Sequence, residues 1–262
     1  VFDAAQKHML QEPAKALPLA VRAEQLASDR LTGSDRDLAI AKARWLRAEA
    51  LIRTSESDRA WAVIQAALRD IPDAKEGDSV RADLLSLRGF LHLNRGETIA
   101  ALRDLQSAFR LAQQLGDVEG QSKVLQLLAS LYRQAGDDER ADNYYRQASE
   151  LPIDNPSLLM TLHNNRGVLL RQLERFDESN EQFERALVIA RQLESTNAES
   201  LVLRNLARNA ATTGDIAKAS LLVSRALSMI QPGSPNYLDL LVTAAQVSLE
   251  KGNTAEAVSQ IQ

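Results

Sequence analysis

The segment 162–194 decides the fold of this chain, and it reads LHNNRGVLLRQLERFDESNEQFERALVIARQLE. Its first half carries a leucine stripe with the spacing of one face of an α-helix, and its second half carries a similar stripe from Phe183 to Ala190. Only residues 174–177 separate the two stripes, so the segment predicts an antiparallel helical hairpin. Small residues such as Gly167 mark where the two helices touch.

The same hairpin recurs along the chain. Gly167 belongs to a series of small residues that return at a nearly fixed interval: Ala4, Ala48, Gly89, Ala129, Gly167, Ala207 and Ala245. A second series follows the first at a constant offset: Ala16, Ala60, Ala101, Ala141, Ser179, Ala219 and Ala257. A third follows at a larger constant offset: Ala23, Ala67, Ala108, Ala148, Ala186 and Ala226. Self-similarity at a nearly fixed period predicts an array of stacked helical units.

This pattern resembles the tetratricopeptide repeat, which has a small residue at position 8, alanine at 20 and 27, and a large residue near 24. Position 15 holds a glycine in four units, as suits a helix that ends in a left-handed residue: Gly96, Gly136, Gly214 and Gly252. The resemblance implies an all-α, right-handed superhelical solenoid of about seven helix-turn-helix hairpins. The units are longer than the family's usual repeat and look like those of kinesin light chains and bacterial sensory and regulatory proteins.

We expect one solenoid over residues 1–262 with both ends truncated. Its repeats are expected roughly at 1–35, 36–78, 79–116, 117–154, 155–196, 197–233 and 234–262. Helix starts are predicted at Asn155-Pro156 and Ser234-Pro235, because each pair joins a capping side chain to a proline in the first turn. The incomplete last repeat predicts exposed apolar surface around Val258 and Ile261, and hence either a homodimer through the exposed ends or a frayed terminus.

Composition excludes several classes of function. A net charge of −4 argues against direct nucleic-acid binding, and no apolar run approaches the length of a membrane span. No cysteine is present, which leaves the compartment open between periplasm and cytoplasm. Phosphate-binding loops and hydrolase motifs are absent, so no catalytic residue, cofactor or metal is expected. The three histidines, His8, His92 and His163, fit packed or rim positions better than ligand or base roles.

Arginine at position 7, where the family prefers leucine, is the main departure from the repeat pattern. It occurs in three units, at Arg47, Arg88 and Arg166. We expect the aliphatic stems of these side chains to pack against their neighbours while the guanidinium groups reach solvent or a carboxylate.

A ligand site is predicted on the concave face, which in this family is lined by the first helix of each repeat. In repeats four to six the lining positions carry basic and amide side chains and no acid; the predicted contacts are Lys123, Gln126, Arg133, Asn164, Asn165, Arg171, Arg204, Asn205 and Arg208. Amides can pair with an extended peptide backbone, and arginine offers a fork for carboxylate or phosphate. Two structural explanations stay open: arginine and glutamine are good helix formers, and an asparagine can bind the helix of a neighbouring repeat.

The resemblance implies a non-catalytic module that binds a peptide or protein segment, one that is acidic or ends in a free carboxylate. It further implies the sensory or interaction region of a larger bacterial signalling protein, upstream of a diguanylate cyclase, histidine kinase or transcription-factor domain. The alternative is a constitutive scaffold or assembly adaptor that uses the convex face or the ends of the solenoid. Fold alone does not choose between them.

Overall fold

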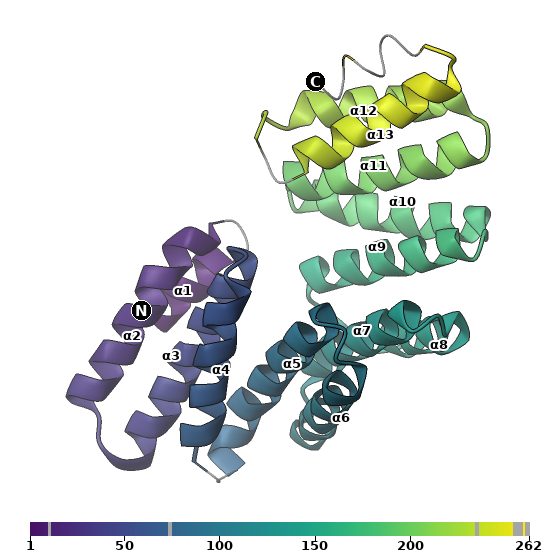
Figure 1. Ribbon diagram of the computed structural model, residues 1–262. Coiled ribbons are helices and arrows are strands. Elements are labelled where there is room, and N and C mark those ends of the chain that lie inside the picture. The colour runs from purple at the N-terminus through teal and green to yellow at the C-terminus, as the bar shows by residue number, and fades with distance from the viewer. Residues whose placement is uncertain (10–11, 73–74, 234–235, 254–258, 260–262) are drawn as a thin grey trace. The chain divides into compact units, whose positions relative to one another are not determined.

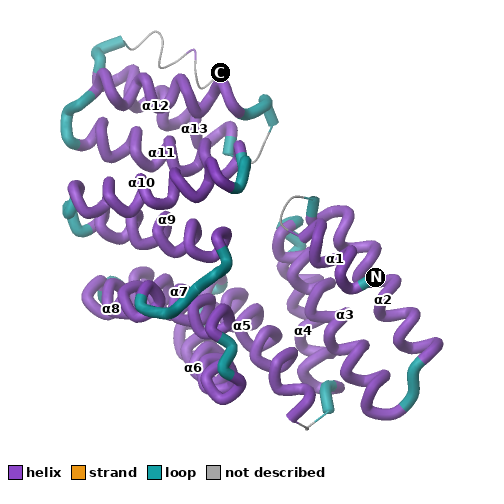
Figure 2. Tube along the Cα trace, turned by 180° about the vertical axis from the view of Figure 1, so that it is seen from behind, coloured by secondary structure: helices purple, strands orange, loops and turns teal. Residues whose placement is uncertain are grey.

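The computed structural model describes residues 1–9, 12–72, 75–233, 236–253 and 259. Within these ranges every regular element is a helix, and none of the described residues forms a strand (Figure 2). The chain divides into two compact units, Val1–Gln134 and Ala135–Gln262, which we call unit 1 and unit 2. The all-α class predicted from the sequence is thereby confirmed.

Unit 1 is built from helical hairpins (Figure 1). Its elements are α1 (Phe2–Met9), α2 (Pro13–Arg30), α3 (Gly33–Arg53), α4 (Ser57–Asp70), the 3-10 turn η1 (Lys75–Gly77), α5 (Asp78–Asn94), α6 (Thr98–Leu115) and α7 (Val118–Gln134). Helices α1 and α2, α3 and α4, and α5 and α6 pack in pairs, and α3, α5 and α7 lie side by side. Helix α3 begins at Gly33, directly after Thr32, whose extended backbone caps the helix.

Unit 2 continues the same plan. Its elements are α8 (Asp138–Ser149), α9 (Pro156–Gln172), α10 (Phe176–Gln192), α11 (Thr196–Thr212), α12 (Ile216–Met229) and α13 (Tyr237–Glu250). Helices α9 and α10 form the hairpin predicted for 162–194, and α11 pairs with α12. The first helices α9 and α11 contact each other, as do α11 and α13, so these three run side by side.

The repeated small residues lie where the helices meet. Every residue of the second and third series within the described part of the chain is buried. At Gly167, an added Cβ would lie 2.7 Å from Cε1 of Phe183, so only glycine allows the ring this close to the α9 backbone. In α1 the expectation was wrong by one residue, because Ala5 is buried whereas Ala4 is exposed; adjacent helical residues point about 100° apart.

Some predicted features lie outside the described residues. They are the Ser234-Pro235 helix start and the terminal positions Ala257, Val258 and Ile261. The other predicted start is confirmed, since Asn155 caps α9 by accepting a hydrogen bond from the Leu158 amide at 3.2 Å, followed by Pro156 in the first turn.

Position 15 takes left-handed backbone even where it is not glycine. The four predicted glycines have φ between 72° and 83°, and the equivalent residues Ser55 and Glu174 have φ of 64° and 58°. The hairpin turn therefore imposes this conformation on the repeat, and two repeats adopt it with an unfavourable residue.

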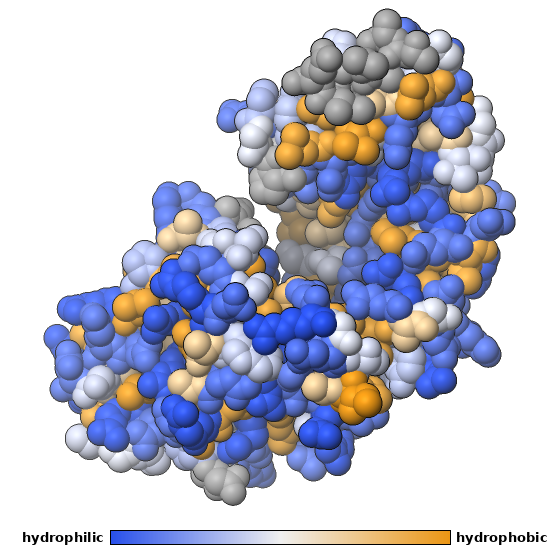
Figure 3. Space-filling view, in the orientation of Figure 1, coloured by the Kyte–Doolittle hydropathy of each residue, from blue (hydrophilic) through white to orange (hydrophobic). Residues whose placement is uncertain are grey.

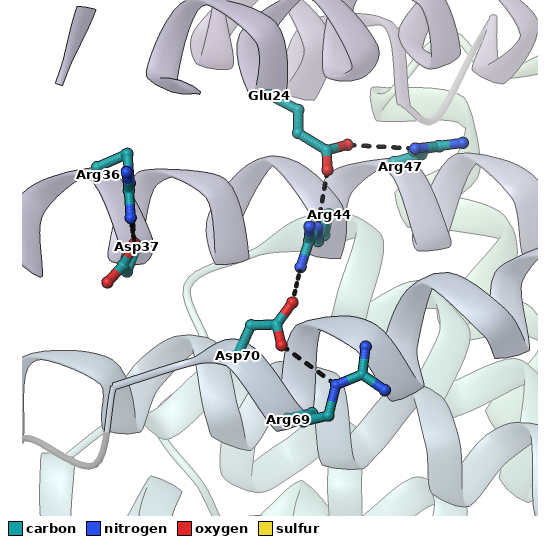
Figure 4. Close-up of polar contacts among 7 residues, drawn as sticks. All are labelled: Glu24, Arg36, Asp37, Arg44, Arg47, Arg69 and Asp70. Carbon is teal, nitrogen blue, oxygen red and sulfur yellow. Dashed lines mark hydrogen bonds and ion pairs between the residues drawn. The ribbon is translucent and has the colours of Figure 1, made fainter. Parts of the chain in front are cut away.

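The three arginines at position 7 each reach a carboxylate, as expected. Arg88 forms a two-pronged pair with buried Asp104, at 2.6 and 2.8 Å, and Arg166 lies 3.2 Å from Asp142. Arg47 lies 3.2 Å from Glu24, a carboxylate that also accepts from Arg44 at 2.7 Å. Figure 4 shows this chain of charges, in which Arg44 continues to Asp70 and so links α2, α3 and α4.

Candidate functional site

Six of the nine predicted contact residues lie on the first helices of unit 2. Asn164, Asn165 and Arg171 come from α9, and Arg204, Asn205 and Arg208 come from α11. Because α9, α11 and α13 are neighbours, these side chains and Asp239 of α13 share one region, which we call the first-helix face of unit 2.

The asparagines of this face bond to one another. Asn205 donates from Nδ2 to Oδ1 of Asn164 at 2.8 Å, and only 3% and 8% of these two residues are exposed. Asn164 in turn donates to Oδ1 of the half-buried Asn165 at 3.4 Å. A buried amide pair between α9 and α11 satisfies polar groups that would otherwise be desolvated without a partner. The geometry thus favours the structural explanation for Asn164 and Asn205.

The arginines are the groups left to meet a ligand. Arg171 donates from Nη1 to Oδ1 of Asn205 at 3.4 Å and lies 5.9 Å from the centre of the Phe183 ring. Burial, together with the positive charges of Arg208 and Arg204, lowers the pKa of Arg171 to about 10. Within the described ranges neither Arg171 nor Arg208 has a carboxylate at ion-pair distance. An anion placed here would relieve this uncompensated charge.

Arg204 already has an acidic neighbour. Its Nη1 forms an ion pair with Oδ2 of Asp239 in the first turn of α13. Only 13% of the Arg204 side chain is exposed, against 66% for Asp239, and the Arg204 Nε is buried without a hydrogen-bond partner. The pair therefore joins the largely buried guanidinium of Arg204 to the solvent-exposed carboxylate of Asp239.

The other three predicted residues lie on α7, which belongs to unit 1. Lys123 is exposed, Gln126 is buried and donates to Oγ of Ser122 at 3.3 Å, and Arg133 is partly buried. Near Lys123 lies Asp83 of α5, whose pKa burial raises to about 6, with the Lys123 charge opposing the rise. Asp83 was not among the residues predicted from the sequence to contact a ligand.

Sequence reasoning missed a second polar chain in unit 2. The fully buried Asn209 donates from Nδ2 to Oγ of Ser179 at 2.8 Å and to Oδ1 of Asn180 at 2.9 Å. Ser179 Oγ donates to the Gly167 carbonyl at 2.7 Å, so these bonds join α11, α10 and α9. The available signal was an asparagine inside a helix, where its propensity is poor.

The histidines are partly buried and have polar partners. His8 lies 3.0 Å from Glu12, His163 lies 2.8 Å from Gln182, and His92 contacts Glu97 while its ring meets Trp61 edge-on at 4.8 Å. Burial lowers the pKa of His163. In the part of the chain that is described, no cluster of three or more acids and histidines could hold a metal ion. None of its helices combines the length and apolarity needed to cross a membrane.

Comparison with known proteins gives a family match and structural neighbours. The model of the family described as tetratricopeptide repeat matches residues 80–152 and 158–231, more than half of the chain. No curated protein matches.

Three solved structures illustrate the shared fold. BtubC (BKLC) from P. vanneervenii is 21% identical, over 88% of this chain and 89% of its own, with a TM-score of 0.60. A Rap protein complexed with Competence and Sporulation Factor is 15% identical, over 99% and 72%, with a TM-score of 0.74. The Rap conjugation gene regulator of plasmid pLS20, in complex with the Phr* peptide, is 14% identical, over 98% and 70%, with a TM-score of 0.74.

Proposed function

We propose, given that this chain belongs to the tetratricopeptide repeat family, that it binds a peptide or protein segment on the first-helix face of unit 2. The family's fold is generally a non-catalytic interaction module. Two of the structural neighbours were solved with Competence and Sporulation Factor or the Phr* peptide bound, which supports this class of partner. We further propose that the chain is the sensory or interaction region of a larger bacterial signalling protein.

One observation carries the proposal: three arginines gather on this face and have one carboxylate among them. Arg204 is paired with Asp239, whereas the partly buried Arg171 and the exposed Arg208 have no acidic partner among the described residues. A guanidinium kept partly buried without a counter-charge, as in Arg171, costs stability unless a ligand supplies one. Asn165 is half-buried at the edge of the amide pair, and we propose that its amide contacts a peptide backbone.

A selection from a random peptide library displayed on phage tests this function. We expect enriched peptides to bind the chain, and Arg171→Ala and Arg208→Ala each to weaken them by about 1–3 kcal/mol, the usual value of a charge-assisted hydrogen bond. Arg185→Ala, on the exposed side of α10, is the matched control and should leave binding unchanged. Enriched peptides that bind the wild type and the three variants with equal affinity would show that the site lies elsewhere on the chain.

The alternative is a constitutive scaffold, and the exposed side of α13 is the observation in its favour. Leu238, Val242 and Leu249 are 71%, 49% and 52% exposed, and hydrophobic side chains gather along this helix in Figure 3. Contiguous apolar surface commonly marks a protein contact. If Val242→Glu abolished a stable complex that the arginine substitutions left intact, the scaffold would be the better account.

A further inference from the structure

The contact between Arg204 and Asp239 is the one place where the described part of the first-helix face of unit 2 neutralises its own arginines. The two side chains come from different helices, α11 and α13, and are far apart in sequence. Their exposures differ: 13% of the Arg204 side chain is accessible, against 66% for Asp239. Asp239 can therefore leave the pair for water at little cost, whereas Arg204 stays where packing holds it.

The pair also leaves Arg204 incompletely satisfied. Asp239 contacts it through Nη1, and the buried Nε has no hydrogen-bond partner. A carboxylate that engaged the guanidinium through two nitrogens would form the stronger, forked arrangement. Asp239 thus occupies the position that a carboxylate of an acidic ligand would take, but it bonds to the guanidinium through one nitrogen only.

The charges around the pair decide which ligand can replace Asp239. Arg208 and Arg204 both act on Arg171 electrostatically, and the only acid paired with any of the three in the described part of unit 2 is Asp239. A segment with several carboxylates could meet Arg204 and the two unpaired arginines together. A neutral segment would gain nothing to offset the loss of the existing pair.

We propose that Asp239 is a built-in competitor that holds Arg204 until the carboxylates of an acidic peptide segment displace it. This inference rests on the proposed function and adds to it the chemical class of the partner and a way in which the site excludes others. Asp239 sets a threshold: it raises the dissociation constant of every acidic segment and leaves that of a neutral segment unchanged. A ligand that displaces Asp239 and also meets the unpaired arginines must bring more than one negative charge.

Fluorescence anisotropy with two synthetic probes tests the inference. Fluorescein-labelled hexaglutamate is the acidic probe and labelled hexaglutamine the neutral one, both at low ionic strength, where screening is weak. Asp239→Asn should tighten hexaglutamate binding by up to about fivefold, the upper end of the range for releasing one partly exposed ion pair. The matched control is Asp177→Asn, an exposed acid in the first turn of α10, which changes net charge equally. In an Arg204→Ala background, Asp239→Asn should give no further gain.

Each alternative result overturns the inference. Equal tightening by Asp177→Asn would mean that net charge alone is responsible. A gain that persists without Arg204 would mean that Asp239 acts on the ligand directly, and hexaglutamine that binds Asp239→Asn more tightly would remove the charge requirement. Hexaglutamate that bound neither wild type nor Asp239→Asn would also refute it, yet the proposed function would stand if library peptides bound through Arg171 and Arg208. Failure of that selection is a separate outcome.

Discussion

The buried amide pair between α9 and α11 predicts that Asn164 and Asn205 stabilise unit 2 together. Asn205→Ala removes the 2.8 Å bond and leaves Oδ1 of Asn164 buried without a donor. A buried acceptor without a hydrogen-bond donor lowers the free energy of unfolding by about 1–3 kcal/mol. The better helix propensity of alanine offsets about 0.5 kcal/mol of that loss. Asn164→Ala should cost a similar amount, because it orphans the Asn205 amide. We therefore expect each single substitution to lower the free energy of unfolding by about 0.5–2.5 kcal/mol, the difference between these two effects.

The double substitution distinguishes a bonded pair from two independent buried residues. With both amides gone, neither partner of the 2.8 Å bond is left orphaned, so the loss should fall short of the sum of the singles by about 1 kcal/mol. Urea unfolding followed by circular dichroism measures all four proteins. Asn143→Ala, at an exposed position of α8, is the matched control and should be neutral or slightly stabilising. Losses that add to within about 0.3–0.5 kcal/mol would refute the pairing.

Local geometry gives three further predictions. Gly167→Ala should lower the free energy of unfolding by about 1–3 kcal/mol, because the added methyl group would overlap the Phe183 ring, and adding Phe183→Leu should reduce that loss. An unshifted urea midpoint for Gly167→Ala alone would contradict the close packing. Glu174→Gly should raise the free energy of unfolding by up to about 1 kcal/mol, because φ is 58° at this position and glycine adopts such a backbone without strain. Gly214→Ala, at φ 83°, should lower it for the same reason. Thermal melts in which both variants shift in the same direction would disprove the shared turn. The raised pKa of Asp83, about 6 against an ordinary 3.8, means that the folded state binds the proton more tightly, so stability falls as pH rises through this interval. Asp83→Asn should abolish that fall and gain about 1–3 kcal/mol at pH 7, and parallel stability–pH curves would show Asp83 to be solvated.

Much of the fold was determined by local sequence. Hydrophobic periodicity, the recurring small residues and the glycines at position 15 specify helical hairpins, because each feature acts within one unit or between adjacent helices. The arginines at position 7, which depart from the repeat pattern, also behaved as predicted. Arg88 pairs with Asp104 because a long side chain on a helix face can pack its aliphatic stem and still reach a carboxylate. In the first helix, which packs against fewer neighbours, the buried position was misplaced by one residue at Ala4.

The candidate site depended on tertiary structure. The sequence selected Asn164, Asn205 and Arg204 equally, since all three fall at lining positions of first helices. Packing of α9, α11 and α13 then gave them different roles: the asparagines bond to each other in the interior, and Arg204 meets an acid from the next repeat. These partners lie a whole repeat apart in the chain, so no local pattern encodes their pairing. Whether a polar side chain serves the fold or a ligand is decided by what packs against it, and that is fixed only when the repeats stack.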